Sequence, residues 1–402
     1  MRIESGRAVV GIVGLLACLA GCTEDPDGSD DAVAPDGPLF GASALIPGEV
    51  RTSFLAFGET LTDELETDLS ETLEIPSAGL AIAGPELGTF FLVDGQAPVA
   101  SRWEIGDDGE PRPTGEISFA NISPSANSAR PANFVYASPT KAYVLDTLVG
   151  EMAIWNPADL SIVGTVDIEE ELEGDGFIAG VGARPVERDG EIVVPISFFT
   201  FTGIIGPTSR LLFIDPTTDS VREVVDIDCA SVSHVIVADD GTLYAGSDAA
   251  SITNRLGGLS NGEECFVRID PGSYEIAERT LISERTGGVP AGGMFLSSGT
   301  LAYVRVLDES LVPEGKATIG ELNSTPMWHW GRLDLAGTDD AVVFDERDPV
   351  SQSNLSFLVD GRSWAVEPGA DFASGRLVDL SGEAPASGAE LPGIVLNAFR
   401  IR

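Results

Sequence analysis

Positively charged side chains are scarce in this chain of 402 residues. Lys and Arg together number 23 against 64 Asp and Glu, which gives a formal net charge of −41. Lysine occurs only as Lys141 and Lys316. Because nucleic-acid binding needs clustered Lys and Arg to neutralise phosphates, this balance excludes a nucleic-acid partner. It favours simple solubility, cationic partners or a salty medium instead.

Histidine is equally rare, with only His234 and His329 in the chain. A metal site built from several histidines is therefore excluded by count. His329 stands between Trp328 and Trp330, and this cluster is a candidate for the lining of a binding face, although aromatic packing in a core explains it equally well. Histidines are more often structural than catalytic, so His234, Trp328, His329 and Trp330 form a weak candidate binding set.

The chain also lacks the short motifs that carry common chemistries. It contains no Gly-x-x-x-x-Gly-Lys loop and no His-Glu-x-x-His. The densest acidic run, 169–176, lacks the alternating Asp-x-Asp-x-Asp-Gly spacing of a calcium loop, so a solvated loop is the better interpretation. No catalytic residue is predicted.

The chain has no long apolar run. A short one near the amino terminus, 8–20, cannot span a bilayer about 30 Å thick. Arg2 and Arg7 give it a basic start, as in an export signal. The run ends in Leu19-Ala20-Gly21-Cys22, which resembles the bacterial lipobox. This resemblance implies a signal peptide over 1–21 and a lipid on Cys22, whereas the alternative is a plain secretory signal cut near Gly21.

The residues that follow cannot form a core. The segment 22–38 carries acids, prolines and glycines and one large apolar residue, Val33, so we expect a flexible acidic tether there. Acyl chains on Cys22 would hold it to a membrane, since each buried CH₂ adds about 0.8 kcal/mol. Thr23 replaces the Asp that retains enteric lipoproteins at the inner membrane. We therefore predict a cell-envelope protein at the outer membrane or cell surface.

Two cysteines, Cys229 and Cys265, remain after this processing. An exported protein meets an oxidising space, so a disulfide between them is the default expectation. In the loop-entropy view it would contribute about 3–4 kcal/mol. The competing interpretation is two buried free thiols, and a metal pair is disfavoured because no Cys-x-x-Cys is present.

A strand–turn–strand pattern recurs in the folded part of the chain, 39–402. Its clearest copies are 153–168, 212–227 and 266–277, each with an Asx-Pro turn between β-branched runs. The Asx residues lie at 156, 215 and 270, spaced by 59 and 55 residues. Weaker turns stand at 107–109, 334–337 and 379–382.

A strand-rich period of roughly 40–60 residues is typical of a β-propeller, in which one four-stranded blade fills each period. Six turns indicate six blades, and the ends, 52–57 and 394–401, could build a seventh by joining the first and last strands. We predict an all-β propeller of seven blades, with six to eight left open; the alternative is a pair of β-sandwiches. The insertions 248–264 and 307–325 are expected as loops on one face.

The chain resembles bacterial propeller lipoproteins of the myxobacterial MxcI type. The segments that carry this resemblance are the lipobox, Ile117–Asn121, Ser138–Tyr143 and Ile154–Pro157. This resemblance implies a role in siderophore and iron uptake, and it carries no defined site residues.

Three functions follow as hypotheses. The favoured one is a membrane-anchored binding or accessory protein rather than an enzyme, with a ferric siderophore or an envelope receptor protein as its partner. The second is an enzyme of the propeller lactonase or quinoprotein type, which would need acids, Arg or His converging on the axis, often around Ca²⁺. The third is an interaction scaffold in the envelope. No other cofactor is indicated.

Overall fold

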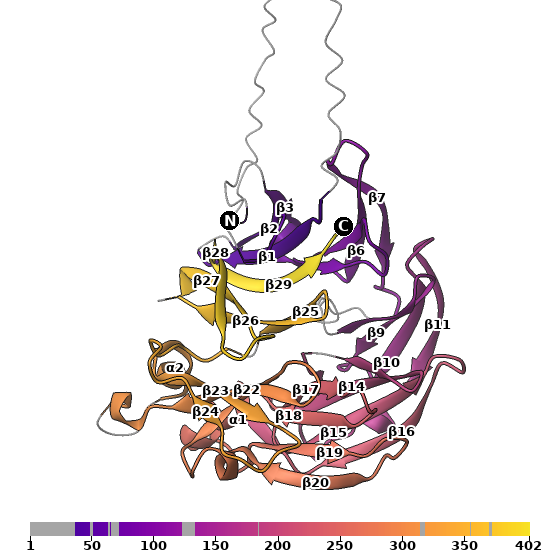
Figure 1. Ribbon diagram of the computed structural model, residues 1–402. Helices are drawn as coiled ribbons and strands as arrows, with labels where there is room; N and C mark the ends of the chain where they lie inside the picture. The colour runs from indigo at the N-terminus through magenta and orange to yellow at the C-terminus, as the bar shows by residue number, and fades with distance from the viewer. Residues whose placement is uncertain are drawn as a thin grey trace, which may run out of the picture.

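The computed structural model describes residues 37–48, 51–62, 65, 72–122, 133–183, 185–313, 318–353, 355–369 and 372–402. In these residues the strands form seven separate antiparallel sheets of four strands each, one of which gains a fifth. Figure 1 shows the sheets set around a common axis as blades. The predicted seven-bladed β-propeller is therefore confirmed. The predicted signal, Cys22 and most of the tether lie outside the described residues.

Blades are numbered here along the chain, and the strands of each are given from the axis outward. The first four blades are blade 1, β29 (Ile394–Arg400), β1 (Phe40–Ile46), β2 (Thr52–Gly58) and β3 (Leu73–Ile75); blade 2, β4 (Leu80–Ala83), β5 (Thr89–Val93), β6 (Val99–Ile105) and β7 (Pro111–Ser118); blade 3, β8 (Phe134–Ser138), β9 (Lys141–Asp146), β10 (Glu151–Asn156) and β11 (Ser161–Asp167); blade 4, β12 (Ile178–Val181), β14 (Glu191–Phe199), β15 (Ile205–Asp215) and β16 (Ser220–Ile227), with β13 (Val186–Arg188) on β14.

The remaining three blades have the same order. They are blade 5, β17 (Val232–Val237), β18 (Leu243–Ser247), β19 (Cys265–Ile269) and β20 (Ile276–Leu281); blade 6, β21 (Ala291–Leu296), β22 (Leu301–Leu307), β23 (Trp328–Asp334) and β24 (Val342–Val343); blade 7, β25 (Ser356–Val359), β26 (Arg362–Pro368), β27 (Ser374–Asp379) and β28 (Ala386–Pro392).

The ring is closed by the two ends of the folded chain. The last strand, β29, is the innermost strand of blade 1 and pairs antiparallel with β1, with Phe40 opposite Arg400. Beyond this pair, the backbone N–H of Leu39 donates to the carbonyl oxygen of Arg402 at 3.0 Å. The last strand thus completes the four-stranded sheet that the first strands begin, which confirms the seventh blade expected from the chain ends.

All six turns marked in the sequence join the two outermost strands of a blade, in blades 2 to 7. In five of them an Asx side chain closes the turn by accepting from the backbone N–H two residues later. The distances are 3.2 Å at Asp108, 3.0 Å at Asn156, 2.8 Å at Asp215, 3.1 Å at Asp334 and 2.9 Å at Asp379. This is the hydrogen bond that makes Asx residues favour turns, and it explains why the sequence repeat is visible at the rim.

The two long insertions connect the second and third strands of blades 5 and 6. They were expected as loops, but each contains a helix, α1 (Ala249–Leu256) and α2 (Ile319–Ser324), and the two helices contact each other. Asp248 caps α1 through the N–H of Ala250, and Thr318 with Glu321 forms a capping box on α2. The short 3₁₀ turns are η1 (Pro76–Ala78), η4 (Glu170–Leu172), η5 (Ile282–Arg285) and η6 (Glu309–Leu311).

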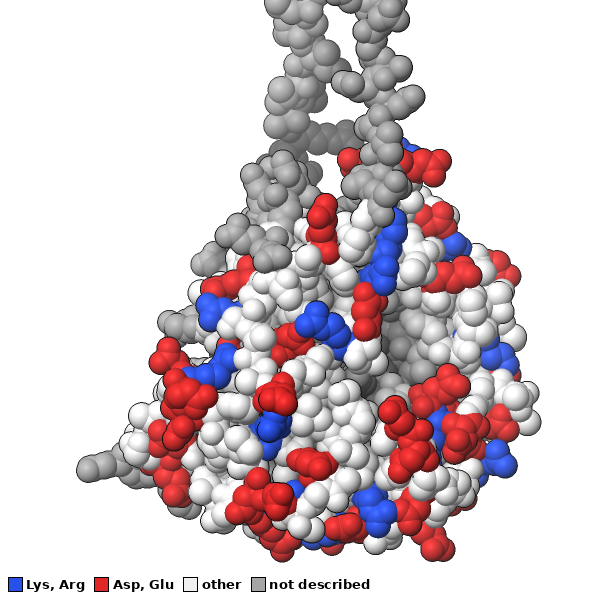
Figure 2. Space-filling view, viewed as in Figure 1, with Lys and Arg blue, Asp and Glu red and all other residues white. Residues whose placement is uncertain are grey.

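Because the strands of a blade alternate in direction, the second-to-third connections of all blades open onto one face, which we call the insertion face. Cys229 and Cys265 are bonded as a disulfide, with Cα atoms 5.4 Å apart, and both are buried. The bond ties the segment before β17 to the end of the α1 insertion. In Figure 2 the acidic side chains outnumber the basic ones over the visible surface. Within the described residues no helix is long and apolar enough to cross a membrane.

Candidate functional site

A cavity of about 650 Å³ lies on the axis of the propeller, and we call it the channel. It is lined by residues of the innermost strands of six blades, β29, β4, β8, β12, β17 and β25. The inner strand of blade 6, β21, contributes no lining residue, because α1 packs against it. A volume of several hundred Å³ suits a small organic ligand.

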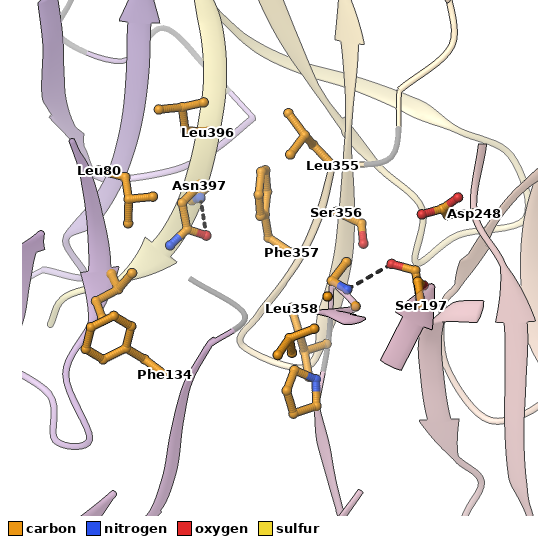
Figure 3. A pocket seen from close by; sticks show the side chains of 18 of the residues that line it. Leu80, Phe134, Ser197, Asp248, Leu355, Ser356, Phe357, Leu358, Leu396 and Asn397 are labelled. Carbon is orange, nitrogen blue, oxygen red and sulfur yellow. Dashed lines mark hydrogen bonds between the residues drawn. The ribbon is translucent and has the colours of Figure 1, made fainter. Parts of the chain in front are cut away.

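Most of the channel wall is apolar. In Figure 3 Leu80, Phe134 and Leu396 lie on one side of the cavity, with Phe357 between them and the opposite wall. We call the apolar wall of blades 1 to 4 the apolar arc; its members include Leu80, Ile82, Phe134, Val181, Phe199 and Leu396. A surface of this kind gains free energy by contact with an apolar part of a ligand, about 25 cal/mol for each Å² removed from water.

Serine and asparagine side chains interrupt the apolar wall, and most of them tie inner strands together. The Ser197 hydroxyl donates to the carbonyl oxygen of Val232 at 2.9 Å, and Ser233 Oγ accepts from the N–H of Ala183 at 2.8 Å. The amide of Asn397 donates to the carbonyl oxygen of Ala81 at 2.9 Å. These bonds run between neighbouring blades, so they hold the channel in a fixed shape.

Asp248 is the one carboxylate among the described residues of the channel wall, and it lies beside Ser197 and Ser356 in Figure 3. Burial raises the pKa of Asp248 from 3.8 to about 6, and hydrogen bonds from the Ser231 hydroxyl and the Ala250 N–H oppose this rise. Tyr136 is the other ionisable lining residue, and burial raises its pKa as well. No Lys, Arg or His is among the lining residues.

A second cavity of about 460 Å³ opens above the channel, and we call it the mouth. It lies between α1, α2 and blade 7, and it shares Ala250 and Leu355 with the channel. A larger share of its lining residues have polar side chains, among them Thr253, Asn254, Asn323, Gln352, Ser353 and Ser374. The two cavities adjoin at Ala250 and Leu355 and together form one site.

A buried charge lies behind the wall of the mouth. Arg305, in β22, is 0% exposed, and its guanidinium is stacked on the Trp330 ring with 3.5 Å between the guanidinium carbon and the ring centroid. Its Nη2 donates to the carbonyl oxygen of Val366, a mouth residue, at 3.4 Å. Burial lowers the pKa of Arg305 to about 9, so it is positively charged at neutral pH.

The nearest counter-charge is Glu367 in β26, whose field opposes the fall in the pKa of Arg305. Glu367 Oε1 accepts from the Trp330 indole N–H at 2.7 Å, and it lies 3.6 Å from Nη2 of Arg347. We call Asp248, Arg305, Gln352 and Glu367 the charged corner, since they gather where blades 5, 6 and 7 meet under α1.

The residues singled out in the sequence lie around this site rather than in it. Trp328 and Trp330 are buried in the core, and His329 Nε2 is 3.4 Å from Asp308 Oδ2. His234 is buried one layer behind the channel, with Nδ1 3.2 Å from the hydroxyl of the lining residue Ser356. None of the four lines the channel or the mouth, and their binding role stays a prediction.

The sequence analysis missed Asp248, Arg305, Gln352 and Glu367. Arg305 carried a signal, because it is a charged residue in an otherwise apolar strand, between Val304 and Val306. Alternation places it on the same side of β22 as Tyr303, and both sides of this strand are buried. The other three carry no local signal, because their place depends on which blades meet.

The convergent acids, Arg or His required by the enzyme hypothesis do not meet in the channel as described. Among all the residues that the structure describes, no three His, Cys, Asp or Glu side chains are grouped so that they could hold a metal ion. The acidic run 169–176 contributes η4 and the rim of a shallow surface pocket with Glu169, Glu173 and Asp175. It is not part of the channel.

Fold and site together define this protein as a seven-bladed β-propeller with an axial, ligand-sized channel. No protein-family model and no curated protein sequence matches the chain. Among solved structures, the periplasmic gluconolactonase of Pseudomonas aeruginosa is similar, with 12% identity, a TM-score of 0.55 and coverage of 90% of this chain and 99% of that one. A hypothetical selenium-binding protein from Sulfolobus tokodaii has 11% identity and a TM-score of 0.54, with coverage of 92% and 94%.

A putative 6-phosphogluconolactonase from Bacteroides fragilis is also similar, with 8% identity, a TM-score of 0.52 and coverage of 94% of this chain and all of the other. At this low identity the three likenesses show the propeller fold, and they carry no activity over to this chain.

Proposed function

We propose that this chain is a non-enzymatic binding protein of the cell envelope, which holds a small amphipathic molecule in its channel and mouth. The observation that carries the proposal is the channel itself, a mostly apolar cavity on the propeller axis that adjoins the mouth and its polar side chains. Apolar pockets with a few placed polar groups are typical of binding sites for small ligands.

The lipobox supports a location outside the cytosol, with Cys22 as the lipid-bearing residue and the membrane as a permanent partner. The disulfide supports the same compartment, because such bonds persist mainly in oxidising spaces. Outer-membrane or surface attachment remains part of the proposal. Mass spectrometry of the processed chain tests it, since an unmodified cysteine at the mature amino terminus would remove the anchor.

Ferric siderophores are the first ligands to test, because the resemblance to MxcI-type lipoproteins points to iron uptake. The purified full chain, held in lipid nanodiscs, is titrated with ferric hydroxamate, catecholate and carboxylate siderophores and with octanol as a plain apolar ligand. Empty nanodiscs supply the blank. We expect saturable binding of at least one compound.

A pair of variants decides whether such binding uses the channel. Leu396→Trp fills the channel wall, whereas Val163→Trp places the same ring on the exposed outer strand β11. We expect the first to abolish binding and the second to preserve it. Absence of binding to every compound, or binding that survives Leu396→Trp, would overturn the proposal. Normal iron uptake in a deletion strain would remove its iron version alone.

A second function, an interaction scaffold for an envelope receptor protein, is favoured by one observation. Large apolar side chains are exposed on the second-to-third connections of four consecutive blades, all on the insertion face. They are Leu148, Phe201, Leu259 and Leu311, with Phe201 87% exposed. Pull-down of envelope proteins with the native chain and with Phe201→Ser tests this function, and equal capture by both would remove it.

A further inference from the structure

Arg305 is a buried cation that makes few of the hydrogen bonds open to its guanidinium. A guanidinium carries five N–H groups, and Arg305 makes one long bond, 3.4 Å from Nη2 to Val366. Its Nε and Nη1 have no partner in the described part of the chain, and neither reaches solvent. A buried, unpaired charged donor is unfavourable by a few kcal/mol. Such a group persists most readily where a ligand or ion completes it.

The charges around Arg305 do not balance. Arg305 and Arg347 share one carboxylate, that of Glu367, which is also occupied by the Trp330 indole. Arg305, Arg347 and Glu367 together therefore carry one positive charge in excess, in a chain whose net charge is −41. An anion at this position would gain attraction in a weakly screened interior, where charges interact much more strongly than in water.

Gln352 lies in the wall of the mouth, near the stem of Arg305. It is 4% exposed, it lines the mouth, and its Oε1 and Nε2 have no partner among the described residues. Gly293 places it beside Arg305, because a Cβ on Gly293 would lie 3.2 Å from Gln352 Oε1 and 3.5 Å from Arg305 Cγ. A carboxamide held by no hydrogen bond can turn into the mouth at small cost. The place that it leaves has the planar shape and size of a carboxylate.

We propose that Arg305, covered by the carboxamide of Gln352, is a carboxylate-binding site, and that the ligand of the channel is an amphiphile with a carboxylate at its polar end. This inference rests on the proposed binding function and adds the chemical class of the ligand. The carboxylate enters as the Gln352 carboxamide turns away and moves within hydrogen-bond distance of Arg305, where it accepts from Nε and Nη1. The apolar part passes Leu355, which the mouth and the channel share, and lies against the apolar arc.

The experiment compares two probes that differ only at the polar end, octanoate and octanol, by calorimetric titration of the full chain in nanodiscs at pH 7. Hydrogen bonds to a charged group contribute about 1.5–3 kcal/mol, so we expect octanoate to bind at least about tenfold more tightly than octanol. Equal affinity for the two would overturn the carboxylate site while leaving the binding function intact. Failure of both probes, together with the siderophores, would overturn the binding function itself.

Two variants test the roles of the residues. Arg305→Gln removes the charge, and we expect it to abolish the preference for octanoate while octanol still binds. Gln352→Glu supplies a carboxylate of its own, so we expect it to raise the midpoint of thermal unfolding and to abolish the same preference. Since Gln352→Glu keeps Arg305, it remains informative if Arg305→Gln does not fold. A lower unfolding midpoint with an unchanged preference would contradict the proposal.

The matched control is Arg362→Gln. Arg362 also stacks on a tryptophan, Trp364, with 5.6 Å from the guanidinium carbon to the ring centroid, but its side chain is exposed. We expect this variant to keep the preference for octanoate. Sodium acetate and sodium chloride form the last arm. If either alone raises the unfolding midpoint of the native chain but not of Gln352→Glu, the site also takes a free small anion; if neither does, the carboxylate must come with the apolar tail.

Discussion

The apolar arc and the charged corner are two parts of one ring, built from the same blade, yet their interiors differ. The arc exposes Leu80, Phe134 and Leu396 to the channel and needs no charge to hold its shape. The corner buries Asp248, Arg305 and Glu367 within a few strands of one another. Blades 3 and 4 also bury charged side chains, but Arg188 and Glu191 have partners, Ser273 and Arg222. The unpaired charge of Arg305 in the corner is therefore not a requirement of the fold.

The difference between the arc and the corner affects the free energy of folding. Burial of a charge without full pairing is unfavourable, and replacement of buried ion pairs by apolar residues is often neutral or stabilising. The insertion with α1 fills the position that β21 would otherwise give to the channel, and it brings the corner together. The asymmetry gives a bound amphiphile one orientation, with its apolar part toward the arc and its polar end toward the corner.

The largest effect is expected from Glu367→Gln. The substitution keeps an oxygen that accepts from Trp330 but leaves Arg305 and Arg347 without a counter-charge. Breaking a buried ion pair in this way costs about 3–5 kcal/mol of unfolding free energy, measured by urea denaturation. Glu390→Gln is the control, because Glu390 pairs with Arg376 at the surface and should change stability by less than about 1 kcal/mol. Equal effects would mean that the corner is no more sensitive to charge than the surface.

Removal of the disulfide tests whether the corner, unlike the arc, depends on a covalent link. Cys229→Ala with Cys265→Ala opens a crosslink over 36 residues, and the loop-entropy view predicts a loss of about 3–4 kcal/mol. Because the bond holds the end of the α1 insertion, we also expect faster amide exchange in α1 than in blades 2 and 3, measured by hydrogen–deuterium exchange. Uniform acceleration around the ring would contradict this local role.

The charge of Asp248 makes the unfolding free energy of the chain depend on pH. Its pKa is about 6 in the folded chain against 3.8 ordinarily, so the folded state holds a proton that the unfolded state loses between these values. The free-energy cost of burying Asp248 is absent below pH 3.8, grows as the pH rises, and is complete above pH 6, at up to about 3 kcal/mol.

Asp248→Asn keeps a good helix cap without this cost. Relative to the native chain, its unfolding free energy should therefore rise between pH 4 and pH 7. Asp308→Asn is the control, because Asp308 caps η6 near the surface and hydrogen bonds to Ser310 lower its pKa. Its difference from the native chain should not rise over that range. Parallel pH profiles for Asp248→Asn and the native chain would show that Asp248 carries no such cost.

The fold was readable from the sequence because its repeat lies in the outer hairpins, where turn chemistry is local. An Asx residue that bonds to the N–H two positions later needs no other part of the chain, so Asn156, Asp215 and Asp379 mark their blades independently. The closing blade was predicted from unmatched strands at both ends, and it is confirmed. The helix α1 was missed although Asp248 is a standard cap, because eight residues give too weak a periodic pattern.

The candidate site was not readable in the same way. Channel residues such as Ser197, Ser356 and Asn397 come from different blades, and they meet only after the ring closes. Periodicity shows that a residue faces inward, not which residues face one another. The tryptophans around His329 attracted notice as a cluster in the sequence, but their rings are buried between strands, where Trp330 supports Arg305. The residue proposed for a function is thus Arg305, the stacking partner of Trp330, and not the tryptophan itself.

The smallest effect is expected at Gly293, where the corner can be disturbed without any change of charge. Gly293 and Gly299 both have positive φ, 65° and 57°, so alanine is strained by about 1–2 kcal/mol at either position. A Cβ at Gly299 meets nothing within 4 Å, whereas at Gly293 it meets Gln352 Oε1 at 3.2 Å and Ala249 Cβ at 3.3 Å. We expect Gly293→Ala to lose up to about 1 kcal/mol more unfolding free energy than Gly299→Ala in urea denaturation, because Gln352 and α1 must shift.

The added methyl group also occupies space next to the place assigned to the carboxylate, so Gly293→Ala should weaken the binding of octanoate and leave that of octanol unchanged. If it weakened both probes equally, the contact would belong to the channel as a whole, and the distinction between arc and corner would not extend to binding.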